Sequence, residues 1–175
     1  LIQRRAAVGC LTGTLALAML DCVSIQDRLT TLGITLPPAT NPAANYTNYV
    51  VTGNLLYVAG KGPLPVDGKA PKGRLGQEFS TAQGYDFARS TGIDILSVVN
   101  SALGNLDRVA RVVKLQGFVN ATPGFEEHPQ VLNGCSDLMV EVFGPKGVHA
   151  RSVFGATSLR ANLPIVIDSI FEIER

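Results

Sequence analysis

The chain has 175 residues, of which 46% are apolar and 17% are charged. Its 15 basic and 14 acidic side chains give a formal net charge of +1. This balance excludes nucleic-acid binding through a broad basic face, and the apolar content excludes a disordered chain. Average soluble proteins carry about 25% charged residues. One hypothesis for the lower fraction here is that partner subunits cover part of the surface.

Residues 1–23 are predicted to be an N-terminal extension, because their composition differs from that of the rest. Arg4 and Arg5 precede an uncharged run, Ala6–Leu20, which is shorter than the about 20 residues that cross a bilayer. The run is compatible with a signal segment cleaved after Ala16–Ala18, with a mitochondrial presequence, or with a helix or tail that has no targeting role. We expect a cytoplasmic protein with no membrane span, or a mitochondrial or exported one if this segment is a targeting signal.

Residues 24–175 are expected to form one domain. Ser24 and Asp27 form a helix-start pattern, and that helix is predicted to stop at Gly33. After a proline-marked loop, residues 49–59 are predicted to form two strands joined by a tight turn at Gly53-Asn54, and a long irregular loop follows.

The next segments alternate between the helical and the strand pattern. Residues 80–106 carry apolar or small residues every three or four positions and are predicted to form a helix. Residues 108–119 are predicted to form a strand, 129–143 a second helix, and 152–156 and 164–174 two further strands. This order predicts an α+β fold, an α/β sandwich in which two main helices cover one face of a single mixed sheet. The bare face of the sheet needs a cover, which an oligomer would supply.

The sequence has none of the standard phosphate-loop, dinucleotide, zinc-protease or esterase motifs. Its three cysteines and two histidines, His128 and His149, have no spacing typical of metal ligands. We therefore predict no metal site and no disulfide framework.

One local pattern has a clear chemical meaning. The glycine-rich segment 144–152 is expected to deliver Arg151 to the start of a strand. A guanidinium group there can hold a carboxylate through two parallel hydrogen bonds. The alternative is that Arg151 pairs with a structural acid, with Asp137, Glu141 and Asp168 as candidates.

Two further residues leave both a functional and an ordinary interpretation open. His149 is either a base or a solvated surface residue. Lys61, which lies among glycines, either binds an anion or is an exposed loop lysine.

Five segments taken together resemble the Rid family (reactive intermediate deaminases, also called YjgF-like proteins), in a less characterised branch. They are Gly53–Pro63, Ala102–Val109, Asn133–Leu138, His149–Ser152 and Ile165–Glu174. The resemblance implies a chorismate-mutase-like fold and a homotrimer with three sites at its subunit interfaces. It also implies hydrolysis of reactive 2-imino acids to 2-keto acids and ammonia, without a metal or an organic cofactor.

The resemblance also assigns roles to particular residues. It implies that Arg151 is catalytic and holds the substrate carboxylate, that Tyr46 lines the pocket, and that Asn133 belongs to the site. Lys61 stands where the family often has Gln, and we include it among the substrate-binding residues.

The chain departs from the family pattern at several positions. Ala59 replaces a Ser, Val153 replaces a Cys, and Arg160 replaces a Pro. Aligning Asp168 with the second Glu of the family's last strand puts Val166 at the Glu that positions the attacking water. A valine can neither accept a proton nor orient water.

Three functions therefore stay open. The first is a 2-imino acid deaminase. The second is a noncatalytic trimer that binds small carboxylates, because of Val166 and Ala59. The third is a ribonuclease or translation inhibitor, a role also attached to the family, which the nearly neutral charge argues against.

Overall fold

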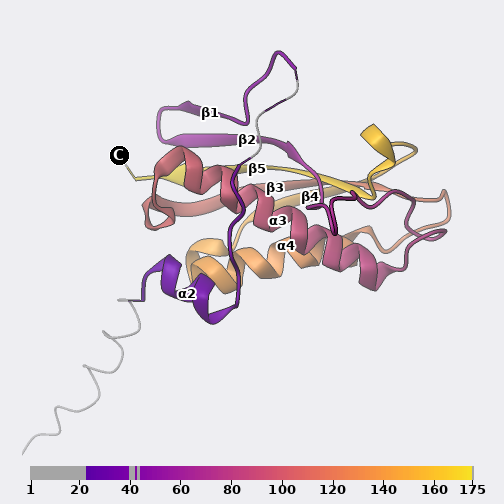
Figure 1. Ribbon diagram of the computed structural model, residues 1–175, viewed down its shortest axis with the longest axis horizontal. Coiled ribbons are helices and arrows are strands. Elements are labelled where there is room, and N and C mark those ends of the chain that lie inside the picture. The colour runs from indigo at the N-terminus through magenta and orange to yellow at the C-terminus, as the bar shows by residue number, and fades with distance from the viewer. Residues whose placement is uncertain (1–22, 40–41, 43, 175) are drawn as a thin grey trace, which may run out of the picture.

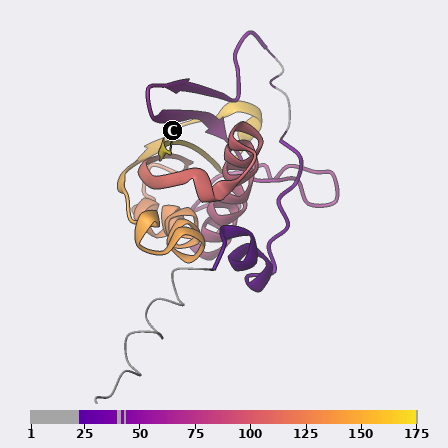
Figure 2. The ribbon, with the colours of Figure 1, turned by 90° about the vertical axis from the view of Figure 1, so that its left-hand side faces the viewer.

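Two long helices cover one face of a five-stranded mixed sheet (Figures 1 and 2). The computed structural model describes residues 23–39, 42 and 44–174. The strand order is β1-β2-β5-β3-β4, in which β3 and β4 run parallel and every other neighbouring pair is antiparallel. The strands are β1 (Tyr49–Thr52), β2 (Leu55–Lys61), β3 (Val109–Asn120), β4 (Ala150–Ala156) and β5 (Ile165–Ile173). The predicted α+β class and the predicted order of elements are confirmed.

The α-helices in the described residues are α2 (Ile25–Thr31), α3 (Thr81–Leu103) and α4 (His128–Phe143). The predicted N-cap of α2 is present, because the Ser24 hydroxyl accepts a hydrogen bond from the Asp27 backbone amide. Ser80 and Gln83 form a capping box at the start of α3, and Gly104, with a positive φ of 75°, ends it. The described ranges also contain three short 3-10 helices, η2 (Leu106–Arg108), η3 (Gly144–Gly147) and η4 (Arg160–Asn162).

Small residues let α3 and α4 pack closely. A Cβ atom added to Gly134 of α4 would lie 2.0 Å from the backbone oxygen of Tyr85 in α3. A Cβ atom on Gly92 would lie 2.8 Å from a Leu138 methyl group and 3.2 Å from the Cys135 sulfur. Burial raises the pKa of the Cys135 thiol to about 12, so Cys135 is a packing residue with no thiolate at neutral pH.

The central strand β5 alternates regularly between buried and partly exposed residues. Its buried residues face the helices, as the predicted Ile165, Ile167, Phe171 and Ile173 stripe requires. In the described part of the chain, no α-helix packs on the opposite face of the sheet. That open face carries large apolar side chains, namely Tyr57, Phe118, Phe154, Val166 and Ile170, which pair across neighbouring strands.

Two strand boundaries differ from the prediction in ways that affect the site. β2 continues through Gly60 to Lys61, where a loop was expected, and β4 begins before Arg151 rather than after it. Both extensions depend on pairing with a neighbouring strand, Lys61 with Ile167 and Arg151 with Leu115.

Residues 1–22 lie outside the described part of the chain, so the N-terminal extension stays a prediction. No α-helix in the described ranges has both the length and the apolar content needed to cross a membrane.

Candidate functional site

Arg151 lies on β4, and its side chain reaches helix α4. Its register partner on β3 is the buried Leu115, which places Arg151 on the helix-covered face of the sheet. The Nη1 atom donates to the Asn133 Oδ1 at 2.7 Å and to the Ser136 Oγ at 3.1 Å. Asn133 and Ser136 are three residues apart, so both lie on the same side of α4. The structure thus brings Arg151 and Asn133, two of the residues named from the resemblance, into direct contact.

The acids that could have neutralised Arg151 are engaged elsewhere or lie on another face. Asp137 accepts a hydrogen bond from the Tyr85 hydroxyl at 3.0 Å, and Glu141 forms an ion pair with Arg89 at 2.6 Å. Asp168 lies opposite Gln116 on the open face of the sheet. Within the described residues Arg151 forms no ion pair. The structural-acid interpretation of Arg151 is wrong, and its exposed guanidinium keeps an uncompensated positive charge.

His149 is hydrogen-bonded through both ring nitrogens. Its Nδ1 lies 2.6 Å from the Gly147 carbonyl oxygen, and its Nε2 lies 3.1 Å from the Ser136 Oγ. Burial lowers the pKa of His149, the Arg151 charge lowers it further, and the hydrogen bond to Gly147 opposes both effects. The expectation of a solvated loop histidine is wrong, because this side chain is half-buried against α4.

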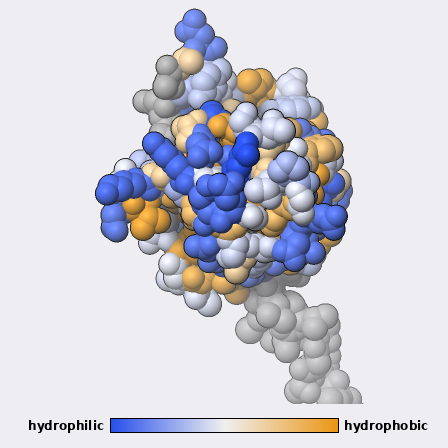
Figure 3. Space-filling view, turned by 90° about the vertical axis from the view of Figure 1, so that its right-hand side faces the viewer, coloured by the Kyte–Doolittle hydropathy of each residue, from blue (hydrophilic) through white to orange (hydrophobic). Residues whose placement is uncertain are grey.

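Tyr46 and Lys61 lie in a different place, a hollow of about 340 Å³. We call it the Lys61 hollow. The residues that line it include Tyr46, Asn48, Ala59, Lys61, Asp94 and Arg160. Several lining residues belong to the β2–α3 connection and η4, at the end of the molecule seen in Figure 3. Hydrophilic side chains gather on that end, with smaller apolar areas between them.

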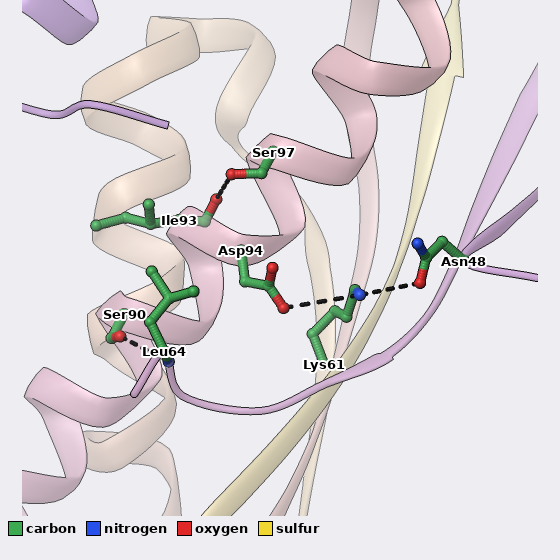
Figure 4. Close-up of polar contacts among 7 residues, drawn as sticks. All are labelled: Asn48, Lys61, Leu64, Ser90, Ile93, Asp94 and Ser97. Atoms are coloured by element: carbon green, nitrogen blue, oxygen red, sulfur yellow. Dashed lines mark hydrogen bonds and ion pairs between the residues drawn. The ribbon is translucent and has the colours of Figure 1, made fainter. Parts of the chain in front are cut away.

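Lys61 forms a polar cluster with Asn48 and Asp94, which also line this hollow (Figure 4). Its Nζ donates to the Asn48 Oδ1 at 3.0 Å and lies 3.7 Å from a carboxylate oxygen of Asp94. Burial raises the pKa of Asp94, and the charges of Lys61 and Arg160 partly oppose this. Lys61 is only 7% exposed, so the interpretation as an exposed loop lysine is wrong.

The four predicted site residues thus form two separate pairs in one copy of the chain. Arg151 and Asn133 touch each other, and neither of them lines the Lys61 hollow that holds Lys61 and the exposed Tyr46. The side chain of Val166 lies beside β2, where its Cγ1 would be 2.9 Å from a Cβ atom on Gly60.

Sequence reasoning missed the contributions of Ser136 and Asp94. A usable signal existed for Ser136, because a residue three positions after Asn133 on a predicted helix shares its face. No sequence signal pointed to Asp94, since its contact with Lys61 depends on how α3 packs on β2. Among the described residues, no group of three or more His, Cys, Asp or Glu side chains could hold a metal ion.

Comparisons with known proteins agree with this architecture. The family described as "YjgF/chorismate mutase-like, putative endoribonuclease" matches residues 26–171. The Trypanosoma cruzi protein named Protein TCP17 is 42% identical over 150 residues, which is 85% of this chain and 94% of that protein.

Two solved structures are similar over most of the chain. The Agrobacterium tumefaciens protein Atu1372, of unknown function, has 41% identity and a TM-score of 0.79, covering 93% of this chain and 100% of that one. A "putative endoribonuclease" from Shewanella oneidensis has 28% identity and a TM-score of 0.83, covering 86% and 100%. Since the family match spans α3, α4, strands β1 to β4 and most of β5, this chain belongs to the YjgF/chorismate-mutase-like family.

Proposed function

We propose that this protein hydrolyses small 2-imino acids to 2-keto acids and ammonia, with Arg151 holding the substrate carboxylate. The observation that carries the proposal is that Arg151 is positioned by two neutral acceptors, Asn133 and Ser136, and by no acid among the residues that the structure describes. Its positive charge is therefore available to an anion from outside the chain. Both groups bond to Nη1, which leaves Nη2 and Nε to grip a carboxylate with two parallel hydrogen bonds.

The reaction asks little of the protein beyond orientation. Water adds to the imine carbon to give a carbinolamine, and loss of ammonia from this intermediate gives the 2-keto acid. A substrate fixed by its carboxylate presents the neighbouring imine carbon to water in one orientation, which removes much of the entropic cost of reaction.

A trimer would complete the site by joining the two residue pairs. Arg151 and Asn133 of one copy would face the Lys61 hollow of a neighbouring copy, where Tyr46 is 58% exposed. The open face of the sheet offers an interface for this assembly, since Phe154 is 50% exposed and Tyr57 is 40% exposed there. Large apolar patches of this kind typically mark interaction surfaces.

The assembly is tested by measuring the solution mass by light scattering. The proposal predicts three times the 18.5 kDa of one chain. It also predicts that Phe154→Glu lowers the mass, because a buried carboxylate would be costly at the interface, while Val140→Glu, at an exposed apolar residue of α4, leaves the mass unchanged. A monomeric wild-type protein would overturn the trimer.

The activity is tested with an imine generated in situ from an amino acid by an amino-acid oxidase, with the protein-free rate subtracted. Losing two charge-assisted hydrogen bonds of about 1.5–3 kcal/mol each predicts a fall in kcat/KM of roughly 100-fold or more for Arg151→Ala. Arg89→Ala is the matched control, since it removes an arginine paired with Glu141 and leaves Arg151 in place. Equal rates for the wild type and Arg151→Ala would reject the proposal.

A second candidate, a noncatalytic binder of small carboxylates, is favoured by Val166, which places no carboxylate at that position of β5. It predicts that calorimetry detects binding of a 2-keto acid that is lost in Arg151→Ala, with no turnover of any imine.

The name of the Shewanella oneidensis relative raises ribonuclease activity as a third candidate. The formal net charge of +1 argues against it. RNA cleavage that co-purifies with the protein and disappears in Arg151→Ala would favour it instead.

A further inference from the structure

A chain of hydrogen bonds connects the Gly147 backbone to Arg151 through two side chains that could move a proton. Gly147 O lies 2.6 Å from His149 Nδ1, and His149 Nε2 lies 3.1 Å from Ser136 Oγ. Ser136 Oγ then lies 3.1 Å from Arg151 Nη1. This series of hydrogen bonds joins three parts of the fold, since His149 follows η3, Ser136 is on α4 and Arg151 is on β4.

The direction of each bond follows from which groups can donate. A carbonyl oxygen only accepts, so His149 Nδ1 carries the proton that it shares with Gly147. A guanidinium only donates, so Ser136 Oγ accepts from Arg151. The serine hydroxyl must therefore donate its own proton to His149 Nε2, which in the neutral imidazole is an unprotonated base. The arrangement is that of an activated hydroxyl, with a base beside it and a third group fixing the tautomer.

A base of this kind would accelerate the imine reaction further, and Val166 cannot supply it because a valine cannot accept a proton. We propose that Ser136 and His149 form a proton relay that activates a water molecule. This water attacks the imine carbon of a substrate whose carboxylate is bound by Arg151. This inference rests on the proposed imine hydrolysis and names the groups that move its protons. Ser136 is adjacent to the guanidinium that would hold the carboxylate, so a water on its hydroxyl lies next to the imine carbon.

The proton transfers balance without any further reactant. The water oxygen forms a bond to the imine carbon while one of its protons passes to Ser136 Oγ, and the Ser136 proton passes to His149 Nε2. The imine nitrogen takes up the electron pair of the C=N π bond. His149 then returns its proton through Ser136 to this nitrogen. The carbinolamine hydroxyl then passes its proton through the same Ser136 and His149 to the nitrogen. As the carbonyl forms, the C–N bond breaks and ammonia leaves.

Burial, and to a smaller extent the charge of Arg151, favours the neutral form of His149. Arg151 faces it from β4 and lowers its pKa below the ordinary 6.5, in addition to the larger effect of burial. On η3, Lys146 is paired with Glu174 at 3.8 Å. Arg111 of β3 and Glu172 of β5 line the same hollow as His149 and carry opposite charges.

The test uses variants that separate hydrogen bonding from proton transfer. His149→Gln retains a polar side chain that can still hold Ser136, but it cannot take up a proton. Ser136→Ala removes the hydroxyl, and Ser136→Thr retains it. The matched control is His128→Gln, which alters the only other histidine in the sequence, one that packs against Phe125 outside this network.

We expect His149→Gln and Ser136→Ala to lower kcat roughly 100-fold, the usual lower range for general acid–base catalysis. KM should change less than about threefold, because Arg151 still binds the carboxylate, and Ser136→Thr should recover part of kcat. In the wild type and in His128→Gln, kcat should rise with pH through an apparent pKa below 6.5. His149→Gln should lack this step.

The possible failures can be distinguished. Wild-type kcat in His149→Gln and Ser136→Ala, with turnover intact, would overturn the relay and leave the imine hydrolase standing. A rise in KM with unchanged kcat would also overturn the relay, because Ser136 would then only orient Arg151. No turnover by the wild type would overturn both. A nitrogen NMR spectrum provides a readout besides activity, and a proton found on Nε2 rather than Nδ1 of neutral His149 would overturn the relay directly.

Discussion

The guanidinium of Arg151 is fixed by an amide, with its Nη1 atom 2.7 Å from the Oδ1 atom of Asn133. An amide oxygen can orient the arginine without cancelling its charge. A carboxylate at the same place would hold the group equally well and would compete with any anionic ligand. The choice of residue at position 133 therefore decides whether Arg151 is a binding group or a structural one.

Replacing this amide by an acid should convert the binding arginine into a paired one. We expect Asn133→Asp to weaken the binding of a 2-keto acid about tenfold or more, since one charge-assisted bond of about 1.5–3 kcal/mol must be broken first. Asn133→Ala should have a smaller effect, because Ser136 still contacts Nη1. Titration calorimetry on both variants checks this, and unchanged or tighter binding by Asn133→Asp would contradict it.

The buried pair of Lys61 and Asp94 should stabilise the fold only as a pair. Their side chains are 8% and 11% exposed, so removing one partner leaves a charge that is poorly solvated. We expect Lys61→Met or Asp94→Leu alone to cost about 3 kcal/mol of unfolding free energy, and the double variant to cost less than the sum. Urea denaturation of the three variants measures this coupling. Strictly additive losses would show that the two charges do not interact.

The contact between α3 and α4 should not tolerate a side chain at Gly134. A Cβ atom there would lie 2.0 Å from the backbone oxygen of Tyr85, so the two helices would have to separate. We expect Gly134→Ala to lower the unfolding free energy by at least about 2 kcal/mol, in the upper part of the range for overpacked cores.

Gly124 provides the matched control, because a Cβ atom there would meet nothing within 4 Å. Gly124→Ala should therefore leave the midpoint of thermal unfolding within a few degrees of the wild type. Comparable losses in the two alanine variants would show that the close approach of the helices is not the cause.

The pH dependence of stability should contain a contribution from His149. Its pKa in the folded protein lies below the ordinary 6.5, so the unfolded chain binds the proton more readily. The contribution of neutral His149 to the unfolding free energy is fully present above pH 6.5. It is lost as the pH falls through the pKa of the folded protein, with a slope of at most about 1.4 kcal/mol per pH unit. Denaturation of the wild type and His149→Gln from pH 7.5 to 5 checks it. A difference between their free energies that does not change with pH would contradict it.

Much of the fold could be predicted because the local signals agree with one another. The alternation in residues 165–173 and the caps at Ser80 and Gly104 determine β5 and α3 without reference to other elements. The site was only half predictable. The conformation of Lys61 depends on the pairing of β2 with β5 and on an acid from α3, neither of which has a signal near Lys61 in the sequence.

The network around Arg151 shows the same limit. Arg151 and Asn133 could be named from motifs, but the bond between Ser136 and His149 requires the η3 turn to bring the loop back onto α4. Such contacts between distant segments are set by tertiary packing, so a lone histidine in a glycine-rich segment gave no indication of its partner.

The central claim is that Arg151 recognises a carboxylate next to the reacting carbon. It is tested most directly by comparing kcat/KM for a 2-imino acid with that for the matching imine that lacks the carboxylate, in the wild type and in Arg151→Ala. We predict that the wild type prefers the imino acid by roughly 100-fold, from two charge-assisted hydrogen bonds, and that the preference disappears in the variant. Equal wild-type rates with the two imines, or a preference that survives in Arg151→Ala, would contradict the account.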